Sequence, residues 1–409
     1  MGKGDTAARQ PRGKVIALGM LIGISALSID ILLPAIPALA EYFRIGEHAA
    51  QYVVTTYLAG FALGQLPMGL LADRFGRRPV IAAGVSVFII TALIGAFAST
   101  ASVLFTARFV QGFAGAVGPV VARAIARDLG GPDKGARLLA TLVAILGLAP
   151  LLAPLLGGAI TELAGWRATL LAIPCYGLIT LVAIWILVPE SLPPHTRQPR
   201  LGTQQVIDSL RALSAHPASR VAVAVACVPY GGYLAMITSA STVLIEDYHL
   251  SPATFGAVFA LGAAAYTAGA ATSRQLMNTR PAHWVLALGI GLFVTSAVLM
   301  ALIMILGPAP LWALWGTVAV FIFAVSLTTP IATSLALAPL PGSAGFTAAL
   351  IGAGSMAAGT LGSWLAATFY APYGLSMLGV MIGSSGATVL AYTVGRATLM
   401  QAHEGTAAP

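Results

Sequence analysis

The strongest constraint on the fold is a series of long apolar segments that are almost free of charge. Hydrophobic residues make up 58% of the 409 residues and charged residues only 8%, with a mean hydropathy of +0.90. An ordinary soluble domain carries about 25% charged residues. A soluble core could not bury this much apolar surface, whereas segments of about 20 apolar residues match the thickness of a bilayer. The sequence therefore predicts an all-α membrane protein embedded in the lipid bilayer.

Twelve segments are long and apolar enough to cross a membrane as helices. Most connections between them are short, which predicts that neighbouring spans run antiparallel. The predicted spans are 15–39, 49–72, 79–98, 102–126, 135–160, 166–188, 218–245, 252–275, 283–306, 310–334, 343–369 and 373–397.

One connection is much longer than the others, and it is polar and rich in proline: residues 189–217. It divides the spans into six plus six, the layout of transporters built from repeated halves. We therefore expect two six-helix bundles joined by a linker. The predicted division is a tail at 1–14, a bundle at 15–188, the linker at 189–217, a second bundle at 218–397 and a tail at 398–409.

The positive charges indicate the orientation, because Lys and Arg collect on the cytoplasmic side of membrane proteins. With both termini inside, 18 of the 21 Lys and Arg residues fall on the cytoplasmic side. Arg44 and Arg167 fall outside, and Arg108 lies within a span. The formal charge of +8 is thus a topology signal and does not indicate nucleic-acid binding. We expect a multi-pass protein of the cytoplasmic (inner) membrane.

Two charged residues, Asp30 and Arg108, lie well inside the predicted spans. At 1.5 Å per helical residue, both lie at similar depth in the outer half of the first bundle. An ion pair, direct or bridged by Gln111 or water, would satisfy both charges. The pair could be static and fix the packing of helices 1 and 4. Alternatively it could act as a proton-linked switch, because a carboxylate can release its proton within the cycle and a guanidinium cannot.

The connection between the second and third spans reads GLLADRFGRRP at residues 69–79. The string resembles motif A of the major facilitator superfamily almost residue for residue. The resemblance implies that this loop is a conformational gate at the cytoplasmic face, although its arginines could also simply anchor the loop there. The implied gate residues are Gly69, Asp73, Arg74, Gly76, Arg77 and Arg78, with Arg127 and Asp128 as partners.

Further strings carry the same resemblance. RFVQGFAGA at 108–116 is similar to the helix 4 motif, and LAPLLAPLLGG at 148–158 to the antiporter motif with Pro150, Pro154, Gly157 and Gly158; Ala153 stands where the motif usually has glycine. DILLPAIP at 30–37 and VLIEDYHLSPATFG at 243–256 resemble the bicyclomycin/chloramphenicol-resistance (Bcr/CflA) branch. This resemblance implies alternating access, drug/proton antiport, and Asp30 and Arg108 as the embedded acid and base. Prolines 150 and 154 should also bend helix 5.

Substrate sites in such folds lie near the membrane midplane between the halves. Aromatic, amide and methionine side chains at that depth suit amphipathic molecules because they combine apolar area with polar or adaptable atoms. Each is also compatible with ordinary packing. The candidates are Tyr57, Phe61, Gln111, Tyr230, Tyr233 and Met236.

The resulting hypothesis is a multidrug exporter for phenicol-like or bicyclomycin-like molecules, with protons as coupling ion, no cofactor, no metal, and a monomeric state. A proton-coupled transporter of an amino acid or a sugar is the alternative; the scarcity of polar residues in the spans speaks against a sugar. A channel is disfavoured by the six-plus-six pattern. An enzyme is not expected, because no Walker, HExxH or GxSxG motif is present.

Overall fold

The computed structural model describes residues 12–197, 203–307, 309–339 and 344–406, and the regular structure within them is helical. The first part of the chain contains α1 (Arg12–Asp30), η1 (Leu33–Ala35), α2 (Ile36–Phe43), α3 (Glu47–Ala50), α4 (Tyr52–Phe75), α5 (Arg77–Ala96), α6 (Ala101–Gly115), α7 (Val117–Leu146) and α8 (Ala149–Leu187). The remainder contains η2 (Pro194–Thr196), α9 (Thr203–Ala215), α10 (Pro217–Cys227), α11 (Pro229–Ser241), η3 (Thr242–Asp247), α12 (Pro252–Met277), α13 (Ala282–Leu306), α14 (Leu311–Leu337), α15 (Ala344–Thr368) and α16 (Leu375–Thr406).

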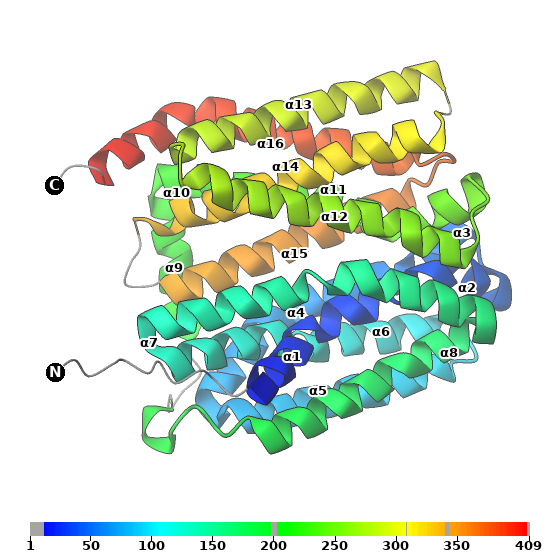
Figure 1. Ribbon diagram of the computed structural model, residues 1–409, viewed down its shortest axis with the longest axis horizontal. Coiled ribbons are helices and arrows are strands. Elements are labelled where there is room, and N and C mark those ends of the chain that lie inside the picture. The colour runs from blue at the N-terminus through cyan, green and yellow to red at the C-terminus, as the bar shows by residue number, and fades with distance from the viewer. Residues whose placement is uncertain (1–11, 198–202, 308, 340–343, 407–409) are drawn as a thin grey trace, which may run out of the picture.

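The helices form two halves that lie side by side (Figure 1). The first half contains α1 to α8 and the second contains α10 to α16. They meet where α8 packs against α12 and α4 packs against α15. In Figure 1, α1 begins and α16 ends on the left, which we call the termini side; α2 and α3 lie at the opposite end, the far side.

Among the described residues, 11 helical stretches are long and apolar enough to cross a membrane. One of them, Arg137–Leu187, has 51 residues, about twice the length that a bilayer requires. Gly165 interrupts it with a φ of 78°, so the stretch makes two crossings. The described chain therefore crosses twelve times, which confirms the predicted fold, and the break at Gly165 lies between the predicted spans 135–160 and 166–188.

Several spans are interrupted within the bilayer. The first helix ends at Asp30 and continues through η1 and α2 to Phe43, because Pro34 and Pro37 cannot donate the hydrogen bonds that a continuous helix needs. The fourth span consists of α6 and the beginning of α7. Helix α7 then continues through the predicted connection to the fifth span, where a β-carbon at Gly135 would lie 2.9 Å from the Ala126 carbonyl oxygen. The chain has therefore turned back by that point.

The linker between the halves contains a helix that the sequence reading did not describe. Helix α9 occupies Thr203–Ala215 and packs against α15. It is amphipathic, with Ser209 and Leu213 buried and Asp208 and Leu210 exposed.

The two halves are joined by hydrogen bonds on the far side. Thr55 Oγ1 and Ser363 Oγ lie 2.6 Å apart. Gln51 Nε2 donates to Thr242 Oγ1 at 3.1 Å. The Tyr370 hydroxyl donates to Glu47 Oε2 at 3.2 Å. The far side is therefore closed in this structure.

Candidate functional site

Arg108 is fully enclosed in the first half, 1% exposed, and its guanidinium is held by hydrogen bonds. Nη1 donates to Gln111 Oε1 at 2.8 Å and to Ser28 Oγ at 3.0 Å. Nη2 donates to the Ser28 carbonyl at 3.2 Å, and Nε to the Val53 carbonyl at 3.3 Å. The guanidinium also lies 4.3 Å from the centre of the Tyr57 ring, a cation–π contact. Four residues on three helices thus fix one buried cation.

This arrangement depends on the close approach of α4 and α6. A β-carbon at Gly112 would overlap the Tyr57 carbonyl oxygen, and one at Gly60 would overlap the Phe109 carbonyl oxygen. Small residues let membrane helices pack with their backbones in contact. Only at this separation can the Arg108 side chain reach Val53 and stack on Tyr57.

Asp30 is not the partner of Arg108, contrary to the predicted ion pair. Within the described chain, the Asp30 carboxylate forms no ion pair and no hydrogen bond, although it is only 4% exposed. The prediction of equal depth did not fix which way each side chain points around its helix. Gln111, the predicted bridge between the two residues, accepts a hydrogen bond from Arg108, and no described hydrogen bond links it to Asp30.

Asp30 instead acts electrostatically on Tyr233 of the second half. Tyr233 stacks on Tyr266, with ring centres 5.4 Å apart, and meets Tyr230 edge-on at 5.8 Å. The Tyr230 and Tyr266 hydroxyls lie 3.3 Å apart. We call Tyr230, Tyr233 and Tyr266 the tyrosine cluster. Through Tyr233 it lies within electrostatic range of Asp30, across the boundary between the halves.

The six predicted substrate residues therefore separate into two groups. Tyr57, Phe61 and Gln111 lie in the packed interior around Arg108, and Met236 is 2% exposed. Tyr230 and Tyr233 are partly buried in the tyrosine cluster. Their role in binding stays a prediction.

The motif at 69–79 forms a charged cluster within the first half. Arg77 Nη1 lies 2.6 Å from Asp73 Oδ1, and Arg77 Nε lies 3.0 Å from Asp128 Oδ2. Arg77 is thus the centre of the cluster, and among the described residues Asp73 forms no ion pair or hydrogen bond with Arg127 or Asp128. The other two arginines cover aromatic rings: Arg74 lies over Phe75 and Arg78 over Trp185.

Glu190, beyond the first half's last span, caps the beginning of α5. Its carboxylate accepts hydrogen bonds from the backbone N–H groups of Arg77, Arg78 and Leu192 at 3.0–3.1 Å. Gly76 permits this contact, because its φ is 100° and a β-carbon there would lie 2.8 Å from Glu190 Oε2. Partial burial raises the pKa of Glu190, but these backbone donors and Arg197 outweigh it, so the pKa lies below its ordinary value of 4.5.

The antiporter-like motif lies at the contact between the halves. A β-carbon at Gly157 would overlap the Ile31 carbonyl oxygen, the residue after Asp30. A β-carbon at Gly158 would overlap the Pro252 carbonyl oxygen of α12. Pro150 is in the first turn of α8, where a missing N–H costs nothing, and the span is interrupted just before it at Gly147 and Leu148. Pro154 lies inside the helix.

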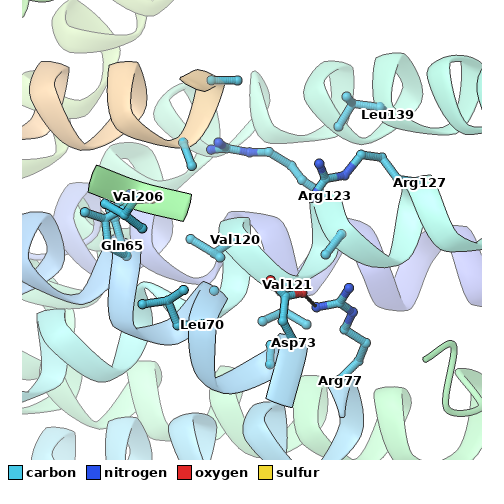
Figure 2. Close-up of a pocket in the computed structure, with 16 residues that line it drawn as sticks. Gln65, Leu70, Asp73, Arg77, Val120, Val121, Arg123, Arg127, Leu139 and Val206 are labelled. Atoms are coloured by element: carbon cyan, nitrogen blue, oxygen red, sulfur yellow. Dashed lines mark hydrogen bonds and ion pairs between the residues drawn. The ribbon is translucent and has the colours of Figure 1, made fainter. Parts of the chain in front are cut away.

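A cavity of about 340 Å³ opens on the termini side between the halves (Figure 2). Helices α4, α5 and α7 supply most of its wall, α9 supplies Val206, and α15 supplies Ala348 and Ala349. Its polar lining is Gln65, Asp73, Arg77, Arg123 and Arg127. Figure 2 shows Asp73 paired with Arg77, while Arg123 reaches toward α15.

The sequence reading did not single out Gln65 and Arg123. The available signal was the spacing of Arg123 and Arg127, which places both arginines on one face of a helix. On the sequence, Arg123 is only a topology signal, whereas Arg127 is a partner that the resemblance implies for the gate. None of the six predicted substrate residues lines this cavity. Within the described residues, no group of three or more His, Cys, Asp or Glu residues could hold a metal ion.

Comparisons with known proteins identify the family of this chain. The family description "Major Facilitator Superfamily" matches residues 18–363. The bicyclomycin resistance protein homolog of Haemophilus influenzae is 27% identical over 92% of this chain and 94% of its own length. Multidrug resistance protein D of Escherichia coli is 29% identical over 90% of this chain and 93% of its own length.

Solved structures agree on the fold. A D-xylose-proton symporter superposes with a TM-score of 0.70 at 17% identity, covering 93% of this chain and 96% of the symporter. A bacterial homolog of the human lysosomal transporter Spinster gives 0.69 at 16% identity, covering 95% and 96%. At these identities the likeness concerns the fold alone. Because the family match spans most of the length and the fold agrees, this chain belongs to the Major Facilitator Superfamily of secondary transporters.

Proposed function

We propose that this transporter exports amphipathic, drug-like molecules in exchange for protons, with both termini in the cytoplasm. The full-length relatives include proteins whose names record bicyclomycin and multidrug resistance. The closed far side and the cavity on the termini side would then correspond to a state open toward the cytoplasm, from which an exporter loads its substrate.

The observation that carries the proposal is the unpaired, buried carboxylate of Asp30. A buried charge without a counter-ion costs several kcal/mol, and binding a proton removes this cost. Asp30 lies where the first helix breaks, next to Ile31, which packs against Gly157 of α8, and within electrostatic range of Tyr233 of the second half. Movement between the halves would change the surroundings of this carboxylate and hence its affinity for a proton.

Arg108 has a different role in this proposal. Its hydrogen bonds to Ser28, Val53 and Gln111 are internal to the first half, so it holds the helices of that half together. The sequence left two roles open for the pair, and we assign packing to Arg108 and proton coupling to Asp30.

The test is drug efflux driven by an imposed pH gradient in proteoliposomes that contain the Asp30→Asn variant. Acceleration by the gradient should fall to the level of protein-free liposomes, because the amide cannot take up and release a proton. Asp208→Asn is the matched control, since Asp208 is an exposed residue of α9. An Asp30→Asn protein that retains the full pH dependence would contradict proton coupling at this residue.

A further inference from the structure

The cavity on the termini side carries positive charge that the protein does not neutralise. Four charged residues line it: Asp73, Arg77, Arg123 and Arg127. Asp73 is paired with Arg77, which is also bound to Asp128. Within the described part of the chain, Arg123 and Arg127 have no ion pair and no side-chain hydrogen bond. The cavity therefore presents two free guanidinium groups.

Arg123 is the more enclosed of the two arginines. It is partly buried on α7, whereas Arg127, one turn later, is exposed. Its guanidinium extends to the second half, because a β-carbon at Gly352 of α15 would lie 4.0 Å from Arg123 Nη1. It also acts electrostatically on Tyr230 of the tyrosine cluster and on Arg127. Two like charges at this spacing repel each other, and an anion between them would relieve the repulsion.

The remaining wall is apolar and includes Leu66, Leu70, Val120, Val121 and Val206. The cavity has a volume of about 340 Å³, within the range of about 300–1,000 Å³ for small-molecule pockets. A ligand that fits must place an apolar body against these side chains and a hydrogen-bond-accepting group at the arginines. Guanidinium groups bind planar carboxylates with two parallel hydrogen bonds.

We infer that this cavity binds an amphipathic molecule through an anionic group, with a carboxylate as the reference chemistry, held by Arg123 and assisted by Arg127. The inference rests on the proposed function and specifies its substrate class. Export would then favour anionic compounds over isosteric cations, which the two arginines would repel. None of the residues that suggested a drug site from the sequence contributes to this selectivity.

The test compares two probes of the same shape, 2-naphthoate and neutral 2-naphthamide. Binding of each to the full-length protein is measured by calorimetry in nanodiscs of phosphatidylcholine. Arg123→Gln should weaken 2-naphthoate binding by about tenfold or more, the usual effect of losing a hydrogen bond to a charged group, and leave 2-naphthamide nearly unchanged. Arg123→Lys should restore part of the loss. Arg137→Gln, an exposed arginine of the same helix outside the cavity, should change neither.

Three results would overturn the inference. The first is equal 2-naphthoate binding by the wild type and Arg123→Gln. The second is an equal loss for both probes in Arg123→Gln, which would indicate a purely structural role. The third is competition by phosphatidylglycerol that removes 2-naphthoate binding, which would assign the arginines to a lipid headgroup.

Failure of the proposed function has a different signature. In that case the wild type would move no compound in response to a pH gradient, while the difference between the two probes in nanodiscs could still be measured. Conversely, proton-driven efflux with no preference for the anion would leave drug/proton antiport intact and overturn only the assignment of Arg123.

Discussion

At the scale of single residues, the two charged residues embedded in the first half, Arg108 and Asp30, lie in different surroundings. Arg108 is surrounded by acceptors and an aromatic ring, so its charge is compensated by Ser28, Val53 and Gln111. No residue of the described chain gives the Asp30 carboxylate an ion pair or a hydrogen bond. A charge that is fully satisfied stabilises packing, whereas an unsatisfied one is available for chemistry.

Arg108→Lys should keep the positive charge but lose the planar group that makes these hydrogen bonds and stacks on Tyr57. The ammonium group cannot reach Val53, Ser28 and Gln111 together, and it cannot stack flat on Tyr57. We expect a loss of about 2 kcal/mol in stability and a clearly lower melting temperature of the purified protein. Arg137→Lys is the control, since the side chain of Arg137 is exposed. An unchanged melting temperature for Arg108→Lys would show that charge alone matters at this position.

Glu190→Gln should make stability depend differently on pH. The pKa of Glu190 is depressed in the folded protein, so the carboxylate stabilises the fold above its ordinary value of 4.5, and this contribution is lost as the pH falls through the depressed value. The wild type should melt higher than Glu190→Gln at pH 7, by the effect of an anion at a helix N-terminus, about 1 kcal/mol or less. The difference should vanish in acid. A difference that grows as the pH falls below 4.5 contradicts this interpretation.

At the scale of helices, glycines set the distances between elements. Gly60 and Gly112 bring α4 and α6 together, and Gly157 and Gly158 bring α8 against the break after Asp30 and against α12. The second contact joins the two halves. Any motion that separates α8 from α12 would break the contact between Gly158 and Pro252.

Gly158→Ala should disfavour the far-side-closed state, because its β-carbon would overlap the Pro252 carbonyl oxygen. The measurement is the rate of disulfide formation between Thr55→Cys and Ser363→Cys, whose hydroxyls lie 2.6 Å apart when the far side is closed. Both native cysteines, which are free, are first replaced by alanine. We expect slower cross-linking, by on the order of tenfold for a cost of about 1.4 kcal/mol. Gly291→Ala is the control because nothing lies within 4 Å of its added β-carbon; equal rates for the two variants would contradict the prediction.

At the scale of the whole molecule, the two halves touch on the far side and enclose a cavity on the termini side. The charged cluster of Asp73, Arg77 and Asp128 stays within the first half in this state. Among the described residues, no side chain of the second half forms an ion pair or hydrogen bond with Arg123 or Arg127, so the polar contacts between the halves lie on the far side.

The same Thr55→Cys/Ser363→Cys pair should also lock the transport cycle. Oxidation should abolish efflux, because alternating access requires the far side to open, and a reducing agent should restore it. Each single-cysteine variant should remain active under oxidation. Transport that continues at the wild-type rate in a fully cross-linked protein would exclude opening between these helices.

Twelve crossings and two halves could be predicted from the sequence alone, because they depend on local properties: the length of each apolar segment and the polarity of the connection at 189–217. The sequence also identified Asp30 and Arg108 as the embedded charges. Counting residues along a helix gives depth, and Tyr57, a predicted residue of the substrate site, lies in the structure against Arg108.

Only the tertiary structure decided which groups meet at that depth. The direction of a side chain around its helix, and the distance between helices, follow from packing that Gly60, Gly112 and Gly157 permit. For this reason Arg108 binds Ser28 and Gln111 and does not pair with Asp30, and Arg123, a topology signal on the sequence, lies with the implied gate partner Arg127 in one cavity. Depth is a property of one helix and can be counted, whereas contact is a property of several helices packed together.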